Sequence, residues 1–328
     1  MRGPQDTMKP SKKLTGILKA LAVLVCLALI VRYFSTHTEE FELLKSISPR
    51  DILALIGILF VVQATHCFKL YLLVLPLGLR DVPFWRWFGI ITVSRFVNQH
   101  MLQGAHIYRF LKLKKDYQFS YTKSLGFTVY YLWIETVSLL AVTFLIIGYA
   151  HLTPKYDFGT VLATLAGVLA ASLIGPAVVM LLYQRFGRGR LPVWDERVAG
   201  ISDTILKHVR NPRFLIFYGL ITVGFILVYL SAVRIGFAAL GVPVSFYQNV
   251  LFTVVLILTR MFNIVPANIG VSELVCGTIS EAINISFGSG ILVAGIVRIV
   301  NYLIYGGVTL GVYAWPVLTG KASQKSGA

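Results

Sequence analysis

The chain alternates between long apolar runs and short polar or basic stretches. A helix that crosses a membrane needs roughly 20 predominantly apolar residues with few charges. We interpret six of the runs as membrane-spanning helices, at about residues 17–31, 52–75, 125–149, 160–182, 214–240 and 290–315. The pattern therefore predicts an all-α polytopic membrane protein.

Two further apolar stretches contain too many polar residues for a helix that faces lipid. The first runs from Gly89 to Tyr108 and includes Arg95, and the second runs from Gln248 to Ile285. Irregular backbone at membrane depth survives only where it is buried in protein or lines a wet cavity. We therefore expect two re-entrant broken helices in addition to the six spans.

The second of these stretches contains signals for a helix break. Pro266 lacks a backbone N–H and clashes with the preceding helical turn, and Gly270 tolerates the φ values that a reversal needs. Ser272 and Glu273 then suit the first turn of a new helix, where free N–H groups and the positive end of the helix dipole favour oxygen atoms. The helix that starts near Gln248 is therefore expected to end at this break.

Composition supports the membrane assignment. Mean hydropathy is +0.75, 56% of the 328 residues are hydrophobic and only 13% are charged, which excludes a soluble domain of useful size. We treat residues 1–328 as a single integral membrane domain. The cysteines are isolated from one another and from histidine spacings that hold metals, so the sequence indicates neither a disulfide framework nor a metal site.

The net charge of +16 is concentrated between the apolar runs. Basic residues cluster before the first run, at 109–123 and at 184–213, and the positive-inside rule places such clusters in the cytoplasm. We therefore expect a multi-pass protein of the cytoplasmic membrane with both termini cytoplasmic, and an amphipathic helix on the inner leaflet within 184–213. Nucleic acid is disfavoured as a partner, because basic clusters between apolar runs set topology and attract anionic lipid headgroups. Whether copies of the chain form a homo-oligomer stays open.

The two interrupted stretches share a short pattern, an Arg-x-x-Asn followed by a glycine. Its members are Arg95, Asn98 and Gly104 in the first stretch, and Arg260, Asn263 and Gly270 in the second. By the charge pattern, the first stretch enters the membrane from the cytoplasm and the second from outside. This arrangement predicts an inverted-topology repeat with halves at about 51–150 and 213–317, whose broken helices meet near the bilayer midplane.

The second half resembles the flippase-like membrane family named for the transmembrane region of lysylphosphatidylglycerol synthases. That family has a Pro-Gly-Gly-x-Gly-x-x-Glu motif, and Pro266, Gly270 and Glu273 keep its Pro, last Gly and Glu, while Ala267 and Asn268 replace the other two glycines. Arg298 fits an Arg of the following span. In the first half, His106 stands where the family tends to have an acidic residue three places before an Arg, here Arg109. The resemblance implies handling of a lipid headgroup, with movement between leaflets as the expected activity. It does not imply synthesis of an aminoacyl lipid, because the sequence contains no soluble aminoacyl-transferase domain.

Ionisable groups at membrane depth cost about 2.5–3.5 kcal/mol each on insertion scales, so they mark a ligand pathway or a charge pair. Arg260, Glu273 and Arg298 admit two interpretations. They form an ion-pair network that fixes the broken helix to the last span, or the arginines bind a lipid phosphate through their paired donors. Of the other charges, Glu135 is expected to pair with Arg95. Lys69 is expected to extend to the headgroups.

Two classes of function stay open. The first is a transporter of a phospholipid or polyprenyl-linked lipid headgroup. The second is a membrane-embedded transferase acting on a lipid-linked sugar, or an accessory subunit of such an enzyme. We find no catalytic, metal-binding or nucleotide-binding motif, which favours transport, and we expect no cofactor. The predicted substrate-binding residues are Arg95, Asn98, Arg260, Asn263, Asn268, Glu273 and Arg298, with Gly104, Pro266 and Gly270 as structural breaks.

Overall fold

The structure is a computed structural model that describes residues 12–79, 81–101, 103–152, 158–187, 211–261, 265 and 268–318. All regular elements in these ranges are helices. The helices are α1 (Lys12–Thr36), α2 (Thr38–Glu42), η1 (Leu43–Ser46), α3 (Pro49–Val74), η2 (Leu75–Leu77), α4 (Phe84–His100), α5 (Gly104–Tyr117), α6 (Tyr121–His151), α7 (Gly159–Leu182), η3 (Tyr183–Gly187), α9 (Pro212–Ala239), α10 (Phe246–Met261), α11 (Val271–Ala282) and α12 (Phe287–Leu318). The all-helical fold class is confirmed. The predicted helix on the inner leaflet lies mainly in 188–210, outside the described residues.

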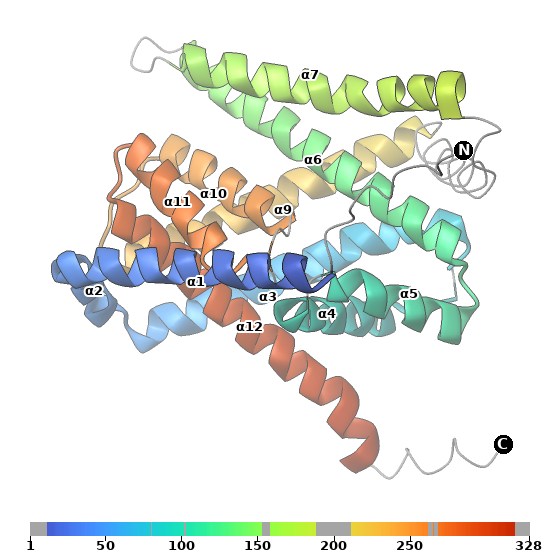
Figure 1. Cartoon of the computed structure of the whole chain (residues 1–328), viewed down its shortest axis with the longest axis horizontal. Coiled ribbons are helices and arrows are strands. Elements are labelled where there is room, and N and C mark those ends of the chain that lie inside the picture. The colour runs from blue at the N-terminus through green and yellow to red at the C-terminus, as the bar shows by residue number, and fades with distance from the viewer. Residues whose placement is uncertain are drawn as a thin grey trace, which may run out of the picture.

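Five helices in the described ranges are long and apolar enough to cross a membrane, and they match five of the six predicted spans. These helices are α3, α6, α7, α9 and α12. The remaining predicted span, residues 17–31, falls in α1, which is not among these five helices. In Figure 1, α1 lies across the front of the bundle, and α7 lies at its edge beside α6. Six spans therefore stay a prediction.

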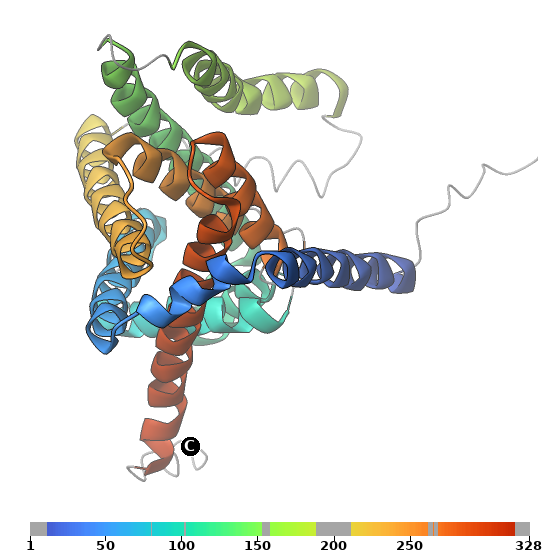
Figure 2. The same cartoon turned by 90° about the vertical axis from the view of Figure 1, so that its left-hand side faces the viewer.

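The helix order long, short, short, long occurs twice along the chain. It runs from α3 to α6 in the first half and from α9 to α12 in the second, with α7 between the halves. The packing is reciprocal as well, because α4 packs against α12 of the other half, α10 packs against α6, and α3 packs against α9. Figures 1 and 2 show the two short-helix pairs, α4–α5 and α10–α11, in separate parts of the bundle. Such an exchange is expected of two halves related by an internal twofold axis, and the inverted repeat and its orientation in a membrane stay predictions.

Both short-helix pairs contain a break at the predicted place. The helix α10 ends at Met261 and α11 begins at Val271, with Glu273 in its first turn, as expected. Gly270 precedes α11 with φ +79°, a left-handed value that favours glycine. Pro266 and Asn263 lie outside the described residues.

The first break requires a glycine because of close packing. The helix α4 ends at His100, Gln103 has φ +59°, and Gly104 begins α5. A Cβ atom on Gly104 would lie 2.9 Å from Cγ1 and 3.0 Å from the carbonyl oxygen of Val97. The absence of a side chain at Gly104 therefore lets α5 start directly against the last turns of α4.

The core has two parts. The larger part joins α9, α10 and α12 to the first turns of α3, and the smaller part joins the end of α3 to α4 and α6. Trp87 is fully buried in the smaller part, where its Nε1 donates to the carbonyl oxygen of Cys67 at 3.0 Å. Between helices in a membrane such close packing, rather than exclusion of water, supplies much of the stabilisation.

Candidate anion-binding cavity

A cavity of about 170 Å³ lies where the two halves meet. Seven helices line it: α3, α4, α5 and α6 from the first half, and α9, α10 and α12 from the second. One water molecule needs only about 10–15 Å³, so the cavity has room for a much larger group. Four arginines are among its lining residues, namely Arg95, Arg109, Arg260 and Arg298. We call this space the arginine cavity.

Arg298 on α12 is the one of the four with a carboxylate partner in the described structure. Its Nε donates to Oε1 of Glu273 at 2.6 Å and its Nη2 to Oε2 of the same side chain at 3.1 Å. Nη2 also donates to the carbonyl oxygen of Asn268 at 3.1 Å. Glu273 in turn accepts from the backbone N–H of Gly270 at 2.9 Å. These contacts tie the last long helix to the start of α11.

Arg95 on α4 has neutral partners. Its Nη1 donates to Oε1 of Gln63 and to the hydroxyl oxygen of Tyr305, both at 3.0 Å. Gln63 is fully buried and donates to Oγ1 of Thr92 at 3.0 Å, which fixes the orientation of its amide. Arg95 is thus held in place by hydrogen bonds that do not cancel its charge. The prediction that Glu135 pairs with Arg95 is wrong.

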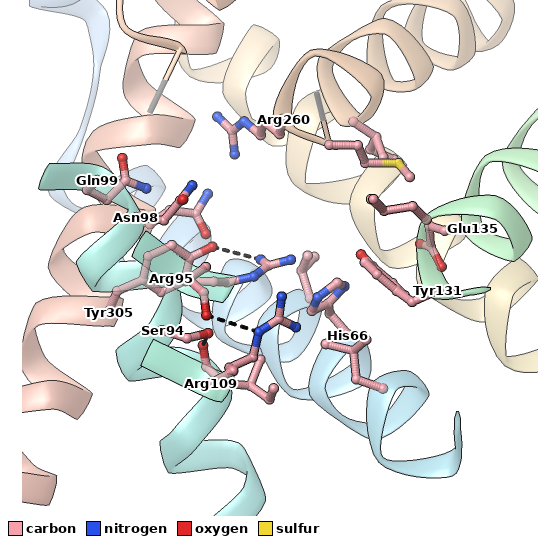
Figure 3. A pocket seen from close by; sticks show the side chains of 18 of the residues that line it. His66, Ser94, Arg95, Asn98, Gln99, Arg109, Tyr131, Glu135, Arg260 and Tyr305 are labelled. Carbon is pink, nitrogen blue, oxygen red and sulfur yellow. Dashed lines mark hydrogen bonds between the residues drawn. The ribbon is translucent and has the colours of Figure 1, made fainter. Parts of the chain in front are cut away.

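Arg260 in the last turn of α10 is held in the same way. Its Nη1 donates to the hydroxyl oxygen of Tyr229 at 3.0 Å, and no described carboxylate lies within ion-pair distance. Glu273 was a predicted partner of both Arg260 and Arg298, and the structure pairs it with Arg298. Figure 3 shows Arg260 reaching into the space that Arg95 and Arg109 also face.

Arg109 on α5 is the most buried of the four, with 6% of its surface exposed. Its Nε donates to the carbonyl oxygen of Ala105 at 3.2 Å, and its Nη2 lies 2.9 Å from Nδ1 of His106. A guanidinium can only donate, so Nδ1 of His106 is the acceptor and this imidazole is neutral. Arg109 therefore has no counter-charge among the described residues.

Glu135 on α6 also lines the cavity, and its charge is already balanced. Its Oε2 accepts from Nζ of Lys69 at 2.6 Å and from the hydroxyl of Tyr218 at 3.2 Å. The side chains of Lys69 and Glu135 are 0% and 4% exposed. Lys69 also lies over the Phe225 ring, 4.7 Å from its centroid. Lys69 was expected to extend to the headgroups; instead the packing of α3 and α6 places it against a buried carboxylate.

Of the seven predicted substrate-binding residues, Asn263 lies outside the described residues and the other six divide into two groups. Arg95, Asn98, Arg260 and Arg298 line the arginine cavity. Asn268 and Glu273 stand behind it: Asn268 donates from Nδ2 to the carbonyl oxygen of Thr259 and accepts from the backbone N–H of Val265, which shapes the turn before α11.

Sequence reasoning missed several residues of the cavity, and Arg109 is the most important. The comparison with the family identified His106 as the replacement of an acidic residue, and Arg109 entered only as the arginine three places later. No sequence motif marks the neutral partners Gln63, Tyr229 and Tyr305. Each lies on a different helix from the arginine that it contacts, at least 31 positions away in the sequence.

Comparison with known families agrees with this architecture. The family model described as the lysylphosphatidylglycerol synthase TM region matches residues 16–308, most of the chain. The chain belongs to this family. As a member of it, and with its several long apolar helices, it is a multi-pass membrane protein. No curated protein and no solved structure gives a significant match to the chain.

Proposed function

We propose that this chain moves the phosphate-bearing headgroup of a lipid across the bilayer, with the arginine cavity as its binding site. The observation that carries the proposal is the convergence of Arg95, Arg109 and Arg260 on one cavity, each held by neutral partners. Guanidinium groups suit phosphate because their planar donors engage two oxygens at once. A buried charge without a partner costs several kcal/mol, and an anionic ligand would offset that cost.

The position of the cavity supports movement rather than chemistry. Arg95 comes from the broken-helix pair of the first half and Arg260 from that of the second. A headgroup bound between the halves is placed so that a change in their packing opens it to one leaflet or the other. Among the described lining residues Glu135 is the only carboxylate, and its pairing with Lys69 makes it a poor general base.

The test is a leaflet-resolved lipid assay in proteoliposomes that contain a phospholipid labelled on its tail. Purified protein should transfer the labelled phospholipid between leaflets without any covalent change in it. Arg95→Gln and Arg260→Gln should each slow transfer about tenfold or more, since a hydrogen bond to a charged group contributes about 1.5–3 kcal/mol. Arg234→Gln is the matched control, because Arg234 is exposed on α9 and does not line the cavity.

Folding is checked in parallel by gel filtration and thermal unfolding of each variant. Unchanged transfer by a well-folded Arg95→Gln/Arg260→Gln double variant would remove the cavity from the mechanism. A chemically altered lipid would instead support the transferase that sequence analysis kept as the alternative.

A further inference from the structure

The arginine cavity has an excess of about three positive charges within the described structure. Four arginines and one carboxylate, Glu135, line it. Glu135 is balanced by Lys69 and Arg298 is balanced by Glu273, whereas Arg95, Arg109 and Arg260 have neutral partners only. The cavity can therefore balance a ligand with more negative charge than the single charge of a phosphodiester.

We infer that the cavity selects a phosphate group with two or more negative charges, as in a phosphate monoester or a diphosphate, over a phosphodiester with one. This inference rests on the proposed phosphate-binding role and specifies its ligand. A terminal phosphate offers three oxygens to donors, and its charge at pH 7 is about −1.5 to −2. A phosphodiester has two such oxygens and a charge of −1.

The distribution of the arginines fits a group with several acceptor oxygens. Arg95 and Arg109 come from α4 and α5 of one broken-helix pair, whereas Arg260 comes from α10 of the other. A ligand that contacts all three must present oxygens in different directions. Asn98 and Tyr305 also line the cavity and add neutral polar groups to it.

The same charge distribution disfavours a cationic headgroup. An ammonium group needs an acceptor with spare negative charge. Glu135, which lines the cavity, and Glu273, which pairs with the lining Arg298, are each within 2.6 Å of a cation. A headgroup with an amino acid attached to its glycerol would bring its ammonium toward unbalanced guanidinium groups. Lysylphosphatidylglycerol is therefore expected to be a poor ligand for this chain.

The test compares lipids that share dioleoyl tails and differ only in the headgroup. Dioleoylglycerol pyrophosphate, phosphatidic acid, phosphatidylglycerol and lysylphosphatidylglycerol are titrated against full-length protein in phosphatidylcholine nanodiscs, and occupancy is measured by native mass spectrometry. We expect dioleoylglycerol pyrophosphate and phosphatidic acid to bind at least about tenfold more tightly than phosphatidylglycerol. Lysylphosphatidylglycerol should bind most weakly. Arg109→Gln should reduce the preference for phosphatidic acid, and Arg234→Gln should preserve it.

Lowering the pH from 7.5 to 5 provides a second readout. The second pKa of a phosphate monoester is about 6, so phosphatidic acid loses charge over this range and its advantage over phosphatidylglycerol should disappear. The arginines stay charged, and the lining histidines His66 and His106 can only gain positive charge, which would act in the opposite direction. Loss of the preference at pH 5 therefore reports the charge of the ligand.

Inorganic pyrophosphate distinguishes a lipid from a soluble ligand. Displacement of phosphatidic acid by micromolar pyrophosphate would assign the site to a soluble anion with the same chemistry. Equal binding of phosphatidic acid and phosphatidylglycerol, with both dependent on Arg95, would overturn the inference and leave the proposed function intact. Binding of all four lipids that is unaffected by Arg95→Gln and Arg260→Gln would overturn both.

Discussion

Arg298 and Glu273 form a two-pronged ion pair that joins α12 to the first turn of α11, with N–O distances of 2.6 and 3.1 Å. Their side chains are only 18% and 10% exposed. Because Glu273 also accepts from the N–H of Gly270, the pair fixes the conformation of the break. This geometry supports the first of the two interpretations, an ion-pair network, for Glu273. Arg298 additionally lines the arginine cavity, so the ligand-binding interpretation still applies to it.

The first prediction follows from this pair. Glu273→Gln leaves the Arg298 guanidinium uncompensated, and removal of one member of a buried pair typically costs about 3–5 kcal/mol. We expect a large loss in folded yield and in thermal stability. The double variant Glu273→Gln/Arg298→Gln should recover most of both. A single variant as stable as the unmodified protein would show that the pair is not structural.

Lipid movement by the recovered double variant separates the two interpretations of Arg298. If this arginine binds phosphate, the double variant should fold and stay slow in the leaflet assay. Normal movement by a well-folded double variant would assign both residues to structure alone.

The second prediction concerns Lys69 and Glu135. Both side chains of this pair are buried, so Glu135→Gln should destabilise the protein by about 3–5 kcal/mol in denaturant or thermal unfolding. Adding Lys69→Met should restore most of the lost stability. The control is Lys45→Met, which removes a pair with Glu42 whose side chains are 76% and 64% exposed. An exposed pair contributes little, so this control should unfold like the unmodified protein. A loss of equal size in the control would contradict the assignment.

The two buried ion pairs, Glu273–Arg298 and Lys69–Glu135, differ in how far the sequence predicts them. A motif and a helix break predicted Glu273 with Arg260 and Arg298 as its possible partners, and the structure pairs it with Arg298. Lys69 and Glu135 are 66 positions apart on two helices without a motif, and apolar periodicity does not reveal which helices are neighbours. The helix types and the breaks follow from local rules such as apolar length and glycine conformation. The partners of Arg95 are Gln63 on α3 and Tyr305 on α12, and they depend on how helices far apart in the sequence pack, which no local pattern encodes.

The third prediction concerns Gly270. Gly270 has φ +79° and ψ −42°, a conformation that would cost alanine of order 1–3 kcal/mol. The Cβ of an alanine here would lie 2.5 Å from Cβ of Cys26 on α1. We expect Gly270→Ala to lower the unfolding temperature, and Cys26→Gly in the same chain to recover the part of the loss that is due to the clash.

Gly57 is the matched control for this substitution. It lies inside α3, and a Cβ atom there would meet no atom within 4 Å. Gly57→Ala should be neutral or stabilising by up to about 1 kcal/mol, because alanine has the higher helix propensity. A Gly270→Ala protein that unfolds like the Gly57→Ala protein would contradict the proposed strain at the break.

The last prediction is the orientation of the chain in the membrane. The helix α6 has 31 residues, so at 1.5 Å per residue it is about 46 Å long, more than the roughly 30 Å hydrocarbon core. Residues before and after α6 should therefore face opposite sides. By the positive-inside rule, the basic residues near the end of α5 predict that this end is cytoplasmic. In a chain lacking the native cysteines, a Cys at Lys114 should react with an impermeant thiol reagent from the inside only, and one at Lys155 from the outside only. Reversed labelling would overturn the orientation. Labelling of both cysteines from one side would show that α6 does not span the membrane. The inverted repeat would then fail, because the end of α5 and the end of α6 would lie on the same side of the membrane.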